Sequence, residues 1–139
     1  MFETMVVGAD GSPTAAKAVA TAIELAMRSG GKLHIVAAYK PVPRSMSGVP
    51  GEFQGSVQPN SHVHGLLADL ASRARAHSVV VETHEYKGDP AEAVQAVADR
   101  VAADLIVIGS KGMKRRVLGS IPNSVAHGSS CAVLVVKTD

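Results

Sequence analysis

The sequence has 139 residues, which fits one domain over 1–139, and its apolar content of 46% is enough to fill one core. Lysine and arginine total 14 against 12 aspartates and glutamates, and this near balance argues against binding nucleic acid or a membrane surface through bulk charge. Aromatic residues make up only 3%, so a stacking platform for single-stranded nucleic acid is hard to build. The lone Cys131 excludes an intramolecular disulfide and a multi-cysteine zinc site. We therefore expect a soluble, cytoplasmic domain with neither nucleic-acid nor membrane partners.

Short apolar runs alternate with helical patterns along the first part of the chain. The run Thr4–Ala9 predicts a strand, and the turn-forming Asp10-Gly11-Ser12-Pro13 after it is typical of a helix start. Three- and four-residue apolar spacing then predicts a helix over 15–28, and a second strand is expected over Lys32–Tyr39. The apolar stripe of that helix comprises Val19, Ala22, Ile23, Ala26 and Met27.

The segment 40–61 is rich in proline, glycine and serine. It is longer than most connections within a compact domain, which predicts a long surface loop. A lid over a bound ligand is the alternative interpretation of the same composition.

The second part of the chain repeats the alternation of helix and strand. Asp89 and Pro90 suit the N-cap and the first position of a helix that follows Gly88. The continuous apolar run Asp104–Gly109 is typical of a strand buried on both faces of a parallel sheet. The remaining expected elements are a helix over 62–77, a strand over 79–86, a helix over 122–127 and a strand over 132–136.

This order of elements predicts an α/β fold with a doubly wound, Rossmann-like sheet of five parallel strands in the order 3-2-1-4-5. Such sheets bind ligands outside the carboxyl ends of their strands, where the winding reverses. The segments that follow the first, second and fourth strands are therefore the candidate binding segments.

A glycine-rich basic loop follows the fourth strand. Gly109 and Gly112 would let backbone N–H groups approach an anion, and Gly119 with Ser120 stands at an expected helix N-terminus. These features predict a phosphate-binding loop; a flexible surface loop with solvated lysines and arginines is the alternative. The loop matches neither the Walker A pattern nor the G-x-G-x-x-G dinucleotide pattern.

Other polar residues carry weaker signals. Asp10 either accepts hydrogen bonds from a base or ribose or serves the turn before the first helix. His62 and His64 point to different faces of their expected helix, so no metal site is predicted there. His127 has no visible serine and aspartate partners, so no hydrolase triad and no catalytic residue is predicted.

Several stretches resemble the universal stress protein family over the whole length of the chain. They are VVGADGS, IVAAY, GDPAEAV, ADLIVIGSKG and LGSIPNSVAHGSSCAVLVV, in that order. The ATP-binding branch of that family carries G-x2-G-x9-G-[S/T] after its fourth strand. Here Gly109 and Gly112 match the first pair and Gly119-Ser120 the last, but six residues separate the pairs, so the loop is three residues short. Pro122 also stands where many relatives carry a hydroxyl residue.

The resemblance implies a nucleotide site at the expected binding edge. The base and ribose would contact Ala9, Asp10, Ala38, Ile108, Gly109, Lys111 and Gly112. The phosphates would contact Gly119, Ser120 and Ile121.

The resemblance further implies a stress-response regulatory protein that binds ATP, AMP or cAMP, with Mg²⁺ accompanying ATP, and acts through ligand-dependent dimer or partner contacts. The apolar final strand Ala132–Val136 is expected at a sheet edge, where pairing with a second copy would cover it and form a homodimer. A weak ATPase or phosphotransferase and a ligand-free dimeric interaction protein are the alternatives.

Overall fold

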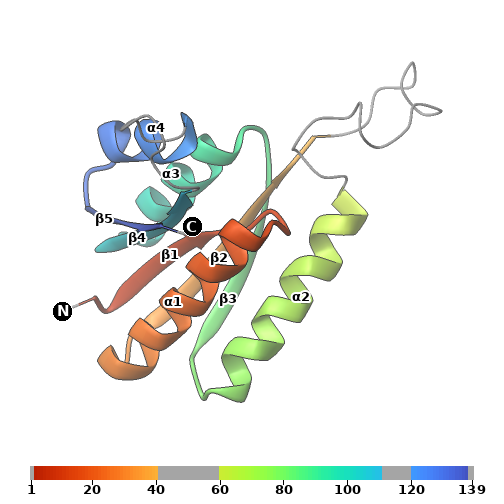
Figure 1. Ribbon diagram of the computed structural model, residues 1–139, viewed down its shortest axis with the longest axis vertical. Coiled ribbons are helices and arrows are strands. Elements are labelled where there is room, and N and C mark those ends of the chain that lie inside the picture. Colours follow the sequence, from red (N-terminus) through yellow and green to blue (C-terminus); the bar gives the residue numbers. More distant parts are fainter. Residues whose placement is uncertain (1, 41–59, 111–119, 138–139) are drawn as a thin grey trace.

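The computed structural model describes residues 2–40, 60–110 and 120–137, in which strands and helices alternate from end to end (Figure 1). The strands are β1 (Thr4–Gly8), β2 (Lys32–Tyr39), β3 (Val81–Lys87), β4 (Leu105–Ser110) and β5 (Ala132–Lys137). The helices are α1 (Pro13–Ser29), α2 (Asn60–Ala76), α3 (Pro90–Val101) and α4 (Ser120–Gly128). None of these helices is both long and apolar enough to cross a membrane.

The five strands form one parallel sheet in the order β3-β2-β1-β4-β5, which confirms the predicted fold class and strand order. Val6 in β1 lies beside His34 in β2 and Ile106 in β4. The winding reverses between β1 and β4, because β2 and β3 lie on one side of β1 whereas β4 and β5 lie on the other. A ligand is therefore expected at the carboxyl ends of these two central strands.

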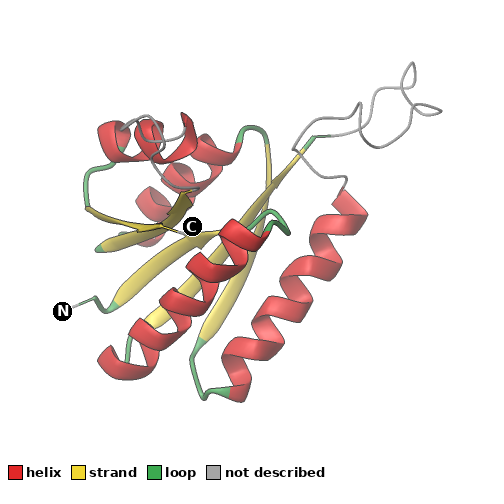
Figure 2. Cartoon of the chain, in the orientation of Figure 1, coloured by secondary structure: helices red, strands yellow, loops and turns green. Residues whose placement is uncertain are grey.

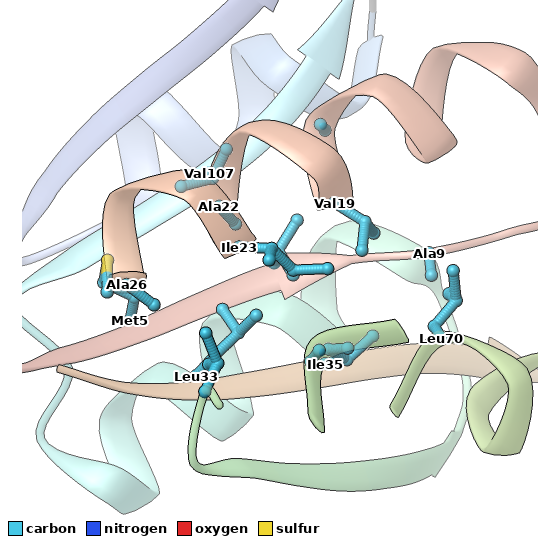
Figure 3. Close-up of a cluster of buried hydrophobic side chains, with 14 of the residues drawn as sticks. Met5, Ala9, Val19, Ala22, Ile23, Ala26, Leu33, Ile35, Leu70 and Val107 are labelled. Atoms are coloured by element: carbon cyan, nitrogen blue, oxygen red, sulfur yellow. The ribbon is translucent and has the colours of Figure 1, made fainter. Parts of the chain in front are cut away.

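Two helices cover each face of the sheet (Figure 2). Successive side chains of a strand point to opposite faces, so Met5 and Val7 pack under α1 and α2 whereas Val6 packs under α3. The α1/α2 face buries large aliphatic residues such as Leu33, Ile35 and Leu70 (Figure 3). The α3/α4 face buries a second cluster in which alanine and valine predominate.

Two helices that begin at the binding edge use the predicted start signals. The Ser12 hydroxyl caps α1 by accepting a hydrogen bond from the Ala15 N–H at 3.1 Å. The Asp89 carboxylate caps α3 in the same way, with the Glu92 N–H as donor. Both caps are followed by proline at the first helical position, where the missing N–H costs nothing.

The structure corrects three details of the predicted elements. Met27 is 51% exposed because it lies at the edge of the α1 stripe, outside the part that faces the sheet. β3 begins at Val81 rather than Val79, since the Val79 N–H is bonded to the Ala74 carbonyl at the end of α2 and Val80 is exposed. The expected loop over 40–61 ends earlier, because α2 begins at Asn60; residues 41–59 lie outside the described part of the chain.

Candidate functional site

A pocket of about 350 Å³ opens at the carboxyl edge of the sheet, around the point where the winding reverses. Its volume lies within the range usual for small-molecule sites. The described residues that line it come from the carboxyl-terminal halves of β1, β2 and β4, from the turn between β1 and α1, and from the N-terminal parts of α1, α3 and α4. They are Gly8, Ala9, Asp10, Ser12, Thr14, Ala15, Val36, Ala38, Pro90, Ala93, Val94, Ile108, Gly109, Ser110, Ile121 and Pro122.

The pocket has an apolar floor and a polar rim. Val36, Val94 and Ile108 are buried at its floor, where a flat apolar group such as a nucleobase would lose contact with water. The first turns of α1, α3 and α4 reach the rim. Because helix N-termini carry partial positive charge, these first turns favour an anion, whereas the Asp10 carboxylate disfavours one close to it.

Asp10 holds the turn between β1 and α1 and also lines the pocket. Its Oδ1 atom accepts a hydrogen bond from the Ser12 N–H at 2.8 Å. Gly11 between them has φ of +84°, a conformation that residues with a Cβ adopt only with strain. The structure thus shows the turn role that the sequence left open, while the carboxylate stays at the rim of the pocket.

Gly109 at the end of β4 is required by packing against α1. A Cβ atom there would lie 2.6 Å from the Thr14 carbonyl oxygen, which is backbone and cannot move aside cheaply. The absence of a side chain therefore lets β4 approach the first turn of α1. The sequence suggested a different reason, the close approach of an anion.

The structure brings together most of the predicted site residues that it describes. Six of them line the pocket: Ala9, Asp10, Ala38, Ile108, Gly109 and Ile121. Ser120 is the first residue of α4. Lys111, Gly112 and Gly119 lie outside the described residues. Pro122 also lines the pocket, and as a proline it offers no N–H there.

Sequence reasoning missed the contribution of α3 to the pocket. Val94 and Ala93 line it, although their helical spacing predicts only core positions. The missed signal is the N-terminal position of both residues in a helix that follows a strand of a doubly wound sheet. Residues near the start of such a helix lie at the same edge as the carboxyl ends of the strands.

A second polar cluster lies on the α3/α4 face, outside the pocket lining. His34 Nδ1 in β2 lies 2.9 Å from His84 Nε2 in β3, and their rings are tilted by 37°. Glu82 in β3 stands beside His34 in the register, and its carboxylate pairs with Lys32 Nζ at 2.8 Å. Arg100 of α3 lies 3.3 Å from His84 Nδ1.

Burial controls the protonation of this cluster. Desolvation lowers the pKa of His34 below its ordinary value, and the neighbouring His84 and Lys32 lower it further. Desolvation also lowers the pKa of His84; the Glu82 carboxylate opposes this effect, whereas Arg100 adds to it. The hydrogen bond from Lys32 lowers the pKa of Glu82. Both imidazoles are therefore neutral at pH 7, and one can donate its N–H to the other.

The sequence analysis did not predict this cluster, because its histidines are far apart along the chain. Glu82 and His84 are two residues apart in a strand, so they lie on the same face of the sheet. This shared face could be predicted from the sequence. His34 lies 50 residues from His84, and only the register of β2 against β3 brings the two together.

Comparison with known proteins finds one family over nearly the whole chain. The sequence profile of the "Universal stress protein family" matches residues 1–137. The universal stress protein YxiE of Bacillus subtilis is 32% identical over 148 residues, covering 99% of this chain and all of the relative. The universal stress protein Rv1636 of Mycobacterium tuberculosis is also 32% identical, over 143 residues that cover 99% of this chain and 97% of the relative.

Solved structures show the same likeness in three dimensions. A crystal structure of a universal stress protein in complex with cAMP is 31% identical and superposes with a TM-score of 0.76, covering 99% of this chain and 98% of that chain. The family profile, the relatives and the fold agree over almost every residue. The chain belongs to the universal stress protein family.

Proposed function

We propose that this protein is a stress-response regulator that binds an adenine nucleotide in the pocket between β1 and β4. The observation that carries the proposal is the pocket itself, in which an apolar floor meets the first turns of three helices. The floor suits a base and the helix N-termini suit a phosphate group. A relative of 31% identity, crystallised in complex with cAMP, supports the same class of ligand.

The proposed ligand carries few phosphates, namely cAMP or AMP. The loop from Gly112 to Gly119 is three residues shorter than in the ATP-binding branch, so it offers up to three fewer backbone N–H donors. Each hydrogen bond to a charged acceptor contributes about 1.5–3 kcal/mol. The outer phosphates of ATP would lose most, since Asp10, Ala38 and Ile108 at the base and ribose end are retained.

Binding is tested by titration calorimetry and thermal unfolding with cAMP, AMP, ADP, ATP and GMP. We expect cAMP or AMP to bind within about tenfold of ATP or more tightly, and GMP more weakly than AMP. A ligand at a hundred times its Kd should raise the free energy of unfolding by about 2.7 kcal/mol. If none of the adenine nucleotides binds at millimolar concentration, the proposal is wrong. An ATP preference above about a hundredfold would contradict only the proposed preference for few phosphates.

We also propose that two copies pair through β5, the edge strand next to β4. Among the described residues no strand pairs with its outer edge, which can extend the sheet into a second copy, and Leu134 is 37% exposed. Light scattering at micromolar concentration should report the mass of two chains, and Leu134→Lys should shift it towards one. Val80→Lys, which adds the same charge at an exposed valine next to the opposite edge strand β3, is the matched control. A wild-type monomer would overturn this assembly.

A further inference from the structure

We propose that His34, Glu82 and His84 bind a divalent transition-metal ion of the borderline class, such as Zn²⁺ or Ni²⁺. One ligand atom from each of these residues lies within 4.8 Å of the other two. Imidazole nitrogen and carboxylate oxygen are common ligands of such ions. None of the three residues lines the nucleotide pocket, so the site is independent of the proposed function.

The two histidines are already spaced for a shared ion. His34 Nδ1 and His84 Nε2 are 2.9 Å apart. At a metal–nitrogen distance of about 2.05 Å, two ligands stand about 2.9 Å apart at a right angle and about 3.3 Å apart at the tetrahedral angle. A right-angle geometry needs no change in this nitrogen–nitrogen distance, and a tetrahedral one needs only a few tenths of an ångström. Both rings must also turn, so that the two nitrogens that now face each other across the hydrogen bond direct their lone pairs at the ion.

The backbone holds the ligands on neighbouring strands. His34 and Glu82 are partners in the parallel register, and His84 follows Glu82 on the same face of β3. His34 is 4% exposed whereas Glu82 is exposed, so the cluster is anchored in the core and opens to solvent. An ion can enter from the side of Glu82, and water can fill its remaining coordination positions.

The ion must compete with two cations for this cluster. Lys32 pairs with Glu82, but both side chains are about half exposed, and solvent-exposed pairs contribute at most about 1 kcal/mol. Arg100 can only donate, so it faces an unprotonated His84 Nδ1. An ion on Nε2 moves the proton of the neutral imidazole to Nδ1, and Arg100 must then turn away. Arg100 therefore weakens the site without blocking it.

The test is titration calorimetry of chelator-treated, tag-free and nucleotide-free protein with ZnCl₂ and then NiCl₂ at pH 7.5. We expect about one ion per chain, with ring resonances of His34 and His84 shifting together in NMR spectra. His84→Gln and Glu82→Gln should each weaken binding at least about tenfold. His62→Gln and His77→Gln, at exposed histidines elsewhere, are the matched controls and should bind like the wild type.

Arg100→Gln sharpens the test because it should tighten binding. It removes a charge beside His84, and the glutamine amide oxygen can accept the new Nδ1–H bond. Arg73→Gln, at an exposed arginine of α2, should leave the affinity unchanged. Thermal unfolding in chelator confirms that each variant is folded, and Glu82→Gln, at the surface, remains informative if His84→Gln does not fold. Wild-type protein that binds neither ion at millimolar concentration, or equal affinity in wild type and Glu82→Gln, would overturn the proposal whether or not nucleotides bind.

Discussion

The two faces of the sheet are built from the same strands but differ in what they bury. The α1/α2 face buries an apolar cluster that includes Leu33, Ile35 and Leu70. The α3/α4 face carries both polar side chains that are buried among the described residues, His34 and Ser110. It also provides the pocket floor at one end and the His34–Glu82–His84 cluster further along β2 and β3.

Side-chain size explains why the pocket lies on the α3/α4 face. The buried residues of α3 are three alanines and two valines, which leave space between that helix and the ends of the strands. The α1 and α2 residues include longer aliphatic chains such as Ile23 and Leu67, which fill the space beneath those helices. One face therefore stabilises the fold, whereas the other combines stability with room for a ligand.

The largest expected effect comes from truncating a large side chain on each face. Ile35→Ala on the closed face should cost near the upper end of the roughly 2–5 kcal/mol typical of such changes, because its fully buried site leaves an empty cavity. Ile108→Ala at the pocket floor should cost near the lower end, since water can enter the enlarged pocket. Urea unfolding followed by circular dichroism measures both. Equal losses would show that the pocket end is packed as tightly as the closed face.

A smaller effect is expected from filling the pocket. Ala38→Leu adds three carbons to a side chain that lines the pocket, so the leucine would occupy the space of the base. The affinity for cAMP should fall at least about tenfold, or 1.4 kcal/mol, with little change in the free energy of unfolding. Titration calorimetry measures the affinity. Ala20→Leu makes the same substitution at an exposed position of α1 and should change nothing. Unaltered affinity in Ala38→Leu would place the base outside this pocket.

The smallest expected effect is a loss of stability in mild acid that originates on the α3/α4 face. Burial lowers the pKa of His34 and His84 below the ordinary value of 6.5, so between that value and the lowered ones the unfolded chain binds more protons than the folded one. The free energy of unfolding should therefore have its full value above about pH 6.5 and should decrease as the pH falls below 6.5.

Urea unfolding at pH 7.5 and pH 5.5, with a chelator present, measures this loss. His84→Gln removes one of the two titrating groups and should reduce the difference between the two pH values. His77→Gln, at an exposed histidine, should retain the wild-type difference. A wild-type difference that His84→Gln leaves intact would assign the acid sensitivity to other groups.

The sequence by itself determined the elements, the fold class and the edge at which to look for a site. Apolar periodicity marked each strand and helix, and Ser12 and Asp89 marked two helix starts, because these signals depend on residues close together in the chain. The glycine-rich segment after β4 and the residues Ala9, Asp10 and Ala38 pointed to the carboxyl edge, where the pocket lies.

Only the tertiary structure decided which distant residues meet. The contact of Gly109 with Thr14 depends on how closely α1 packs on β4, and the pairing of His34 with His84 depends on the register between β2 and β3. The exposure of Met27 likewise depends on how α1 is rotated on the sheet. Local patterns carry no information on register or packing distance, since both follow from the combined fit of all the side chains in the core.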